Sequence, residues 1–361
     1  MTQANKDSTI SGTKGTIDYD SFLEKYKIHR LEVEESQSKE PILMENKSRF
    51  VLMPIKFHTV YDGYKKREAL FWPAEEIDFS HDIINWGKKA SDHDKSIIKK
   101  SLAFLCSSVL GSFYLPEHIS SEVQIPEAKC FYGFEIMVEN IHGEVYSLAI
   151  DQLVHNTDEI KKMFKDVDNA KFIERKKSFA ERWFDKESSL FAEKLVAFSS
   201  IEAIFSLVSF FSIMSLEKKD IIPGLISGIK LILKDHIVHC DFQMSIYSEL
   251  KKRLDPGIIE RIVTEAVEIE LETLEDDYFN KQLDKETKAD IKNVIEYVGD
   301  RVLMGFGNQK HFHSANPYDN LEHECFENVI PKTESSDSQN TTKFSKTEKI
   351  AASEISFDDE F

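Results

Sequence analysis

The sequence predicts an all-α protein built as a bundle of long helices, and three observations lead to this fold class. Segments with apolar residues at a 3.6-residue period cover most of residues 36–325, whereas the alternating runs typical of strands are few. Proline and glycine are scarce there and fall between helices, as in "IIPGLISG" and "LDPGIIERI". The segment Leu195–Ser215 is apolar on all sides, which is typical of a helix at the centre of a bundle.

Composition divides the chain into three parts. Residues 1–35 are polar and rich in Ser, Thr, Lys and Gly, which predicts a mobile N-terminal tail. Residues 36–325 form the predicted helical domain. Residues 326–361 are polar again and cannot bury a core, so we expect them to be disordered. The final stretch "ISFDDEF" sets two phenylalanines among acids, which suggests either a docking peptide or a solubilising acidic tail.

Charge and cysteine usage narrow the function classes. The net charge of -18 argues against nucleic acid or an anionic membrane as the main partner, because both attract basic surfaces. The four cysteines lack C-x-x-C spacing and no signal peptide is visible, so we expect reduced thiols in the cytoplasm, with the nucleus as a second location. Leu195–Ser215 is long enough to cross a bilayer, but its serines and its flanks of both charge signs favour a core helix.

Two stretches place possible metal donors on single helix faces. In "MVENIHGEVYSLAID", Glu139 and His142 form a Glu-x-x-His pair, and Tyr146 lies on the same face two turns beyond Glu139. In "LKDHIVHCDF", His236 and His239 are three residues apart, so both imidazoles point to one side of a helix. The first stretch alone is equally compatible with a polar stripe, and the second alone is more typical of ordinary core histidines.

A third donor strengthens the metal interpretation of these stretches. Glu202 lies in the middle of the apolar segment, where a carboxylate is costly unless it is paired, protonated or bound to a metal ion. Helical bundles that bind two metals use a Glu-x-x-His from each of two helices and one Glu from each of two others. The order of Glu139, His142, Glu202, His236 and His239 is close to that design.

Several long stretches resemble one family, the small subunit (R2, or beta) of class I ribonucleotide reductase. They are "EPILMENKSRFVLMPIKFH", "FWPAEEIDFSHD", "EVQIPEAKCFYGFEIMVENIHGEVYSLAID", "RLDPGIIERIVTEAVEIE" and "ANPYD", within residues 40–320. The resemblance implies a ferritin-like helical bundle and a role in deoxyribonucleotide synthesis for DNA replication and repair. It also implies a dimer with a second small subunit, a large-subunit partner, and a di-iron site that oxidises a tyrosine to a radical.

The resemblance assigns roles to individual residues. Those that match metal ligands are Glu139, His142, Glu202 and His239; Tyr146 matches the radical tyrosine, Trp72 and Asp235 the radical relay, and Phe210 a shielding aromatic. The residues expected to dock on the large subunit are Phe357, Asp358, Asp359, Glu360 and Phe361.

The chain departs from the family at four points. His236 stands where the family has a bridging glutamate, and Val109 or Ser108 stands where it has an aspartate. Ser206 replaces a shielding phenylalanine, and no tyrosine follows Tyr318, so the relay tyrosine of the tail is missing. The family's four carboxylates thus fall to two, which disfavours a dinuclear iron or manganese centre.

Two states of the site stay open at this point. One is a mononuclear iron or zinc site made by Glu202, His239 and His236, with Glu139 as a further ligand. The other is a metal-free site in which a protonated His236 pairs with Glu202 or Glu139. We therefore expect an accessory small subunit with an impaired di-iron site, similar to the ligand-poor beta-prime subunit of some fungi, and leave open whether the chain itself is a catalyst. The alternatives are an active radical-generating subunit with a rearranged site, or another redox or metal-binding role on this fold.

Overall fold

Every regular element in the described part of the chain is a helix, as the sequence predicts. The computed structural model describes residues 19–47, 49, 51–107, 115–185 and 188–315. The helices are α1 (Tyr19–Gln37), α2 (His58–Ala69), η1 (Ala74–Glu76), α3 (Ser80–Lys88), α4 (Asp92–Leu105), α5 (Leu115–Glu122), α6 (Pro126–Leu153), α7 (Thr157–Asp168), α8 (Lys171–Trp183), α9 (Phe191–Ile204), α10 (Leu207–Met214), η3 (Glu217–Lys219), α11 (Pro223–Ser248), α12 (Pro256–Glu275), α13 (Asp277–Asn280) and α14 (Lys285–Gly305). The described residues all belong to the first of two units of the chain, and the second, residues 331–361, lies outside them.

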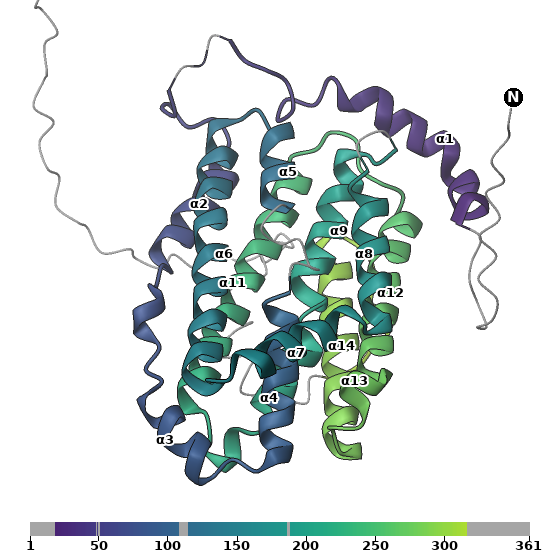
Figure 1. Ribbon diagram of the computed structural model, residues 1–361. Helices are drawn as coiled ribbons and strands as arrows, with labels where there is room; N and C mark the ends of the chain where they lie inside the picture. The colour runs from purple at the N-terminus through teal and green to yellow at the C-terminus, as the bar shows by residue number, and fades with distance from the viewer. Residues whose placement is uncertain (1–18, 48, 50, 108–114, 186–187, 316–361) are drawn as a thin grey trace, which may run out of the picture. The chain divides into compact units, whose positions relative to one another are not determined.

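Helix α9 lies at the centre of the bundle. It packs against α11, α12 and α14, and also against α5 and α8 (Figure 1). The helical stretch Phe191–Lys219 is long and apolar enough to cross a membrane, but 94% of its most apolar window is buried inside the protein. Its apolar side chains therefore contact other helices, as expected for a core helix.

The apolar segment that the sequence suggests as one helix is divided between α9 and α10. The break at Phe205 and Ser206 leaves backbone groups without helical partners, and a buried ion pair satisfies two of them. Lys176 Nζ lies 2.5 Å from Glu270 Oε2 and donates to the carbonyl oxygen of Phe205 at 2.5 Å. Glu270 Oε1 accepts from the backbone N–H of Val208 at 2.8 Å.

The two longest helices, α6 and α11, carry most of the candidate site. Each begins with proline at its first turn, where the missing N–H has no helical partner in any case. They pack against each other and both contact α2, while α4 packs against α6 and α10 (Figure 1). This packing brings the inner faces of α6, α9 and α11 together.

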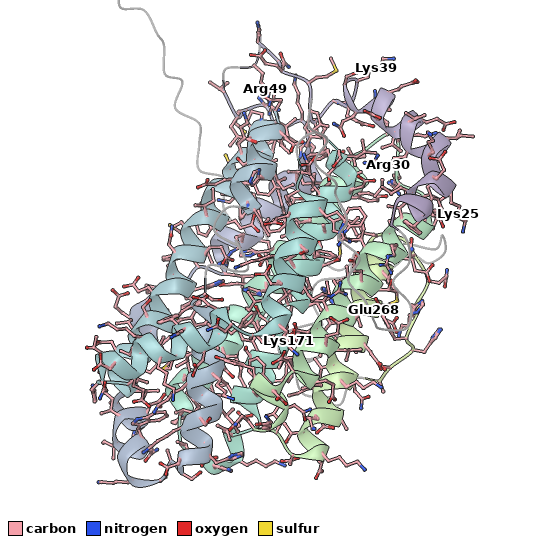
Figure 2. The ribbon with its side chains drawn as sticks, turned by 45° about the vertical axis from the view of Figure 1, so that its right-hand side comes forward. Lys25, Arg30, Lys39, Arg49, Lys171 and Glu268 are labelled. Carbon is pink, nitrogen blue, oxygen red and sulfur yellow. The ribbon has the colours of Figure 1, made fainter. Side chains whose placement is uncertain are left out.

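Helix α1 differs from the predicted N-terminal tail, because Tyr19–Gln37 is helical. It packs against the bundle through Val33 and Tyr26 and also through ion pairs, and its otherwise polar sequence explains why its composition suggests a tail. Arg30 donates to both carboxylate oxygens of Glu193 at 2.7 and 2.9 Å (Figure 2). Lys252 donates to Glu32 at 2.6 Å, and His29 Nε2 donates to the carbonyl oxygen of Arg253 at 2.9 Å.

Candidate metal centre

Three helices bring the five predicted donors together. Glu139 and His142 come from α6, Glu202 from α9, and His236 and His239 from α11; none is more than 8% exposed. Donor atoms of Glu139, Glu202 and His239 lie within 4.8 Å of one another, and so do donor atoms of Glu139, His142 and His236. The donors therefore form two triads that share Glu139.

The donor atoms of the triad Glu139, Glu202 and His239 are suited to a cation. Glu139 Oε1, Glu202 Oε2 and both ring nitrogens of His239 are buried without a hydrogen-bond partner. His239 Nδ1 lies 3.3 Å from Glu139 Oε1 and 3.6 Å from Glu202 Oε2. Donors bonded tetrahedrally to one ion at about 2.1 Å lie roughly 3.4 Å apart. These residues thus fit a single metal ion.

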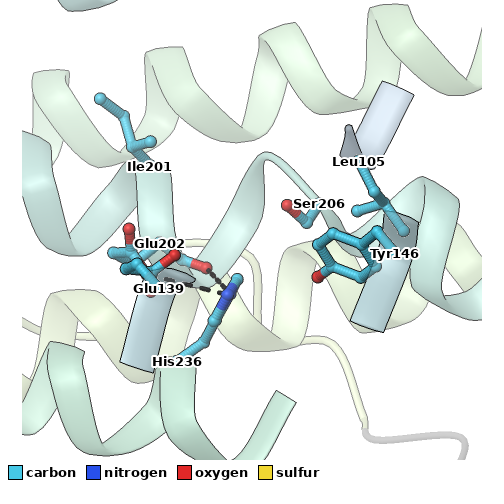
Figure 3. A pocket seen from close by; sticks show the side chains of 7 residues that line it. All are labelled: Leu105, Glu139, Tyr146, Ile201, Glu202, Ser206 and His236. Carbon is cyan, nitrogen blue, oxygen red and sulfur yellow. Dashed lines mark hydrogen bonds and ion pairs between the residues drawn. The ribbon is translucent and has the colours of Figure 1, made fainter. Parts of the chain in front are cut away.

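The second triad is poorly suited to share a second ion, because of the way His236 is held. Its Nδ1 donates to the backbone oxygen of Glu202 at 2.9 Å, which leaves only Nε2, 3.9 Å from Glu202 Oε2, for a metal (Figure 3). One imidazole lone pair cannot bridge two ions as a carboxylate does. The described residues therefore support one cation better than a dinuclear centre.

The hypothesis that a protonated His236 replaces the charge of a metal is wrong. Burial lowers the pKa of His236, so this imidazole is neutral. His239 is the cation instead: burial opposes its charge, but the carboxylates of Glu135, Glu139 and Glu202 raise its pKa to about 10.

Glu135 is a site residue that the sequence interpretation missed. It lies one turn before Glu139 on α6 and is fully buried, with neither carboxylate oxygen hydrogen-bonded. Its Oε1 lies 3.4 Å from His239 Nδ1, although Glu135 belongs to neither donor triad. Burial is the main cause that raises its pKa to about 8. The four-residue spacing from Glu139 is the signal that places Glu135 on the inner face.

The predicted relay residues lie in one hydrogen-bonded line. Trp72 Nε1 donates to Asp235 Oδ2 at 2.9 Å, and His142 Nε2 donates to the same oxygen at 2.9 Å. The Trp72 and His142 rings are stacked with centroids 6.0 Å apart. With Nε2 committed to Asp235, His142 turns Nδ1 toward Glu139 Oε1, 3.4 Å away.

Neighbouring charges set the protonation states of His142 and Asp235. Burial alone would lower the pKa of His142, but the charge of Glu139 and the hydrogen bond to Asp235 raise it to about 9. Burial would raise the pKa of Asp235, but the hydrogen bond and charge of His142 and the charge of Arg67 hold it below its usual value. The protein thus keeps an imidazolium and a carboxylate side by side in its interior.

Tyr146 lies beside a cavity that Ser206 helps to form. The cavity has a volume of about 20 Å³, room for about one water molecule, and is lined by Leu105, Glu139, Tyr146, Ile201, Glu202, Ser206 and His236 (Figure 3). Tyr146 and Ser206 stand on one side of it, and Glu139, Glu202 and His236 on the other. Burial raises the pKa of Tyr146 well above its usual value, so the phenol keeps its proton.

The structure places the predicted shielding aromatic but does not describe the position of the missing aspartate. Phe210 is buried on α10, and its ring centroid lies 5.5 Å from that of His236, so it covers one side of the site. Ser108 and Val109, the candidates for the missing aspartate, lie outside the described residues. Helix α4 ends just before them, and the side chain it contributes to the cavity wall is the apolar Leu105.

The fold and the site together define a class of protein. A helical bundle whose inner helix faces present buried glutamates and histidines, with Glu-x-x-His on one helix, is the arrangement of the ferritin-like metal-carboxylate proteins. Within this class, the family model described as "Ribonucleotide reductase, small chain" matches residues 49–317. The chain belongs to this family.

Individual relatives agree with this family, and those reported below cover 79% to 97% of the chain. Ribonucleoside-diphosphate reductase small chain 1 of Saccharomyces cerevisiae is 40% identical over 361 residues, which span 97% of this chain and 88% of that protein. The small chain of Neurospora crassa is 43% identical over 288 residues, 79% of this chain and 70% of that protein. The solved Rnr4 homodimer of S. cerevisiae superimposes with a TM-score of 0.78 at 38% identity, covering 83% of this chain and 95% of that chain.

Proposed function

We propose that this chain is an accessory small subunit of ribonucleoside-diphosphate reductase, which supports a complete small subunit rather than generating a radical itself. The observation that carries the proposal is the donor set. Glu139, Glu202 and His239 suit one cation, while His236 offers a single nitrogen where a bridging carboxylate would be needed. Ser206 adds a water-sized space beside Tyr146, which weakens the shielding of a radical there.

If iron is bound, the residues of the chain would hold the ion, orient its surroundings and exclude water from one side. Glu139, Glu202 and His239 would hold the ion, which supplies one-electron oxidation when bound. Asp235 fixes His142 with Nδ1 toward Glu139, and Phe210 excludes water on one side. Tyr146 retains its phenolic proton. We expect no more than one iron ion per chain in the purified protein, because the second triad lacks a bridging ligand.

A specific observation favours a second candidate, an active radical-generating subunit with a rearranged metal site. The line from Trp72 through Asp235 to His142 is complete, and Tyr146 lies at the edge of the same cavity. An accessory subunit does not need this line for electron transfer. Its retention is explained equally by stability, since all of its side chains are buried and hydrogen-bonded.

We propose that the partners are the large subunit and a second, complete small subunit. An apolar stripe on the outer face of α6, formed by Phe134, Met137 and Ile141, supports a small-subunit contact. Phe71 extends it, since its ring meets that of Phe134 edge-on at 6.0 Å, and Phe71 and Met137 are 47% and 39% exposed. Exposed apolar patches of this kind mark protein contacts. Met137→Lys should weaken small-subunit association in sedimentation velocity, and an unchanged association constant would place the contact elsewhere.

The large-subunit contact is assigned to Phe357, Asp358, Asp359, Glu360 and Phe361, which lie outside the described residues. The assignment rests on the sequence pattern of aromatic anchors among acids. We further propose a cytoplasmic location with the nucleus as a second compartment, and no nucleic-acid or membrane partner. Fluorescence microscopy of the tagged chain tests the location.

Reconstitution tests the accessory role directly. This chain is mixed with the large subunit and with a small subunit that has all metal ligands, and reduction of a ribonucleoside diphosphate is measured. We expect more activity than with the complete subunit alone, and the same gain from Tyr146→Phe. Reduction by this chain and the large subunit alone, abolished in Tyr146→Phe, would establish the radical-generating alternative instead.

A further inference from the structure

Arg67 is a buried cation with an incomplete set of partners. It lies on α2 with none of its surface exposed, and its Nη1 is 3.0 Å from Asp235 Oδ1. Its Nε and Nη2 are buried without a hydrogen-bond partner. A guanidinium has five N–H donors, so leaving several unused in the interior is costly unless the charge itself has a role.

The charge of Arg67 faces a cluster of buried acids. Burial lowers the pKa of Arg67, while Asp235, Glu135 and Glu139, in that order, act against this effect through their negative charges. Glu202 completes the cluster at the metal centre. Three other buried cations among the described residues are engaged elsewhere: Lys176 with Glu270, Lys194 with Glu122, and Arg301 with Asp241. The imidazoliums of His142 and His239 also lie in this cluster, but each loses its charge when it gives up its proton, for example to bind a metal ion. A guanidinium keeps its charge, so Arg67 is the fixed positive charge of this cluster.

We propose that Arg67 is the internal counter-cation of the metal centre, a positioning residue whose fixed charge keeps the acid cluster folded when no metal is bound. Through Asp235 it also holds His142 in place, because one carboxylate receives Arg67 on Oδ1 and His142 on Oδ2. The same charge repels an incoming cation. Arg67 thus stabilises the metal-free chain and weakens its hold on a divalent ion.

The biological reason for a counter-cation at Arg67 rests on the proposed accessory function. A subunit that serves a partner has to stay folded without its own metal, whereas a radical-generating subunit requires the ion. The prediction for Arg67 itself concerns only stability and metal affinity. It can be tested without the large subunit, a radical or a turnover assay.

The test compares two substitutions at Arg67 with a matched control. Arg67→Met removes the charge at similar length, and Arg67→Lys keeps it. The control, Arg49→Met, breaks another Arg–carboxylate pair with little exposure, between Arg49 and Glu127 at 2.7 Å, at the start of α6 and three turns from Glu139. Melting temperatures of the full chain are measured in chelator and in Zn²⁺, and zinc affinity is measured by competition with a chromophoric chelator.

In chelator, Arg67→Met and Arg49→Met should each melt on the order of 10 °C below the wild type. In zinc, the difference in melting temperature from the wild type in the same solution should shrink by at least half for Arg67→Met and stay unchanged for Arg49→Met. Zinc should bind Arg67→Met at least tenfold more tightly than the wild type, and Arg67→Lys should match the wild type in both measurements. If Arg67→Met is unfolded in chelator, recovery of folded protein on adding zinc supports the proposal.

Three results would overturn the proposal. They are an equal zinc affinity of Arg67→Met and the wild type, an equal recovery of melting temperature by Arg67→Met and Arg49→Met in zinc, or an Arg67→Met chain that stays unfolded in zinc. The outcome is distinct from that of the reconstitution assay. A counter-cation confirmed in a chain that also forms its own radical would refute only the accessory function. A chain with accessory activity and no change in Arg67→Met would refute only the counter-cation.

Discussion

Replacing His236 with glutamate should convert the centre into a strong cation site. His236 Nε2 lies 3.9 Å from Glu202 Oε2, and this imidazole is neutral because burial lowers its pKa. A glutamate there adds a negative charge next to Glu202. At about 4 Å and an effective dielectric constant of about 20, two like charges repel by about 4 kcal/mol.

A divalent ion bound between the two carboxylates removes this repulsion. Four kcal/mol corresponds to roughly a thousandfold in affinity, and proton uptake by the new carboxylate reduces the observed gain. We therefore expect His236→Glu to bind Mn²⁺ at least tenfold more tightly than the wild type. In chelator, the variant should be less stable than the wild type, because the added charge has no partner.

The assay is titration with Mn²⁺, followed by the loss of the free-ion signal in electron paramagnetic resonance. His236→Gln is the matched control, because it removes the imidazole without adding charge and should bind Mn²⁺ no better than the wild type. Equal Mn²⁺ affinity in the Glu and Gln variants, with the helical content of both intact, would refute the reasoning. It would mean that position 236 does not face the bound ion.

Two other predictions concern regions outside the centre. Glu127 accepts hydrogen bonds from Arg49 and from the backbone of Lys56 and Phe57; burial opposes them, but together they lower its pKa. The ionised Glu127 therefore stabilises the fold above about pH 4.3, and this stabilisation is lost as the pH falls through the lower pKa of the folded state. Glu127→Gln should lower the free energy of unfolding by about 3 kcal/mol at pH 7 and make that free energy depend less on pH in urea titrations at acidic pH. An unchanged pH dependence in the variant would contradict this. A peptide "ISFDDEF" should compete with the chain for the large subunit at micromolar concentration. The same peptide with Phe361→Ala should bind about tenfold more weakly, a difference of about 1.4 kcal/mol. If the unchanged peptide does not compete, the tail is not the docking element.

The helical fold and the donor positions could be predicted from spacing. Glu139 and His142 on one helix, and His236 and His239 on another, lie three residues apart, and helix geometry alone directs each pair to one face. Glu202 stood out because a carboxylate within an apolar helix requires a partner. Their distances from one another depend on how α6, α9 and α11 pack, which spacing within a single helix does not determine.

Other features could not be predicted because they depend on tertiary contacts. Arg67 lies in "YDGYKKREA", a polar stretch with no sign that one of its three adjacent cations is buried. The division of α9 from α10 depends on Lys176 and Glu270, which are far from the break in sequence. Helix α1 is held in part by ion pairs such as Arg30 with Glu193, so its hydrophobic pattern is weak. The tautomer of His236 is set by one backbone carbonyl, that of Glu202.

The most direct test of the accessory role is electron paramagnetic resonance with metal analysis after loading with ferrous iron and oxygen. The chain is measured alone and mixed with a complete small subunit. We predict no tyrosyl radical and no more than one iron ion per chain in the isolated protein, with a radical in the mixture that Tyr146→Phe leaves unchanged. A stable tyrosyl radical in the isolated chain, lost in Tyr146→Phe, would contradict this role and show that the single-cation donor set is sufficient for radical formation.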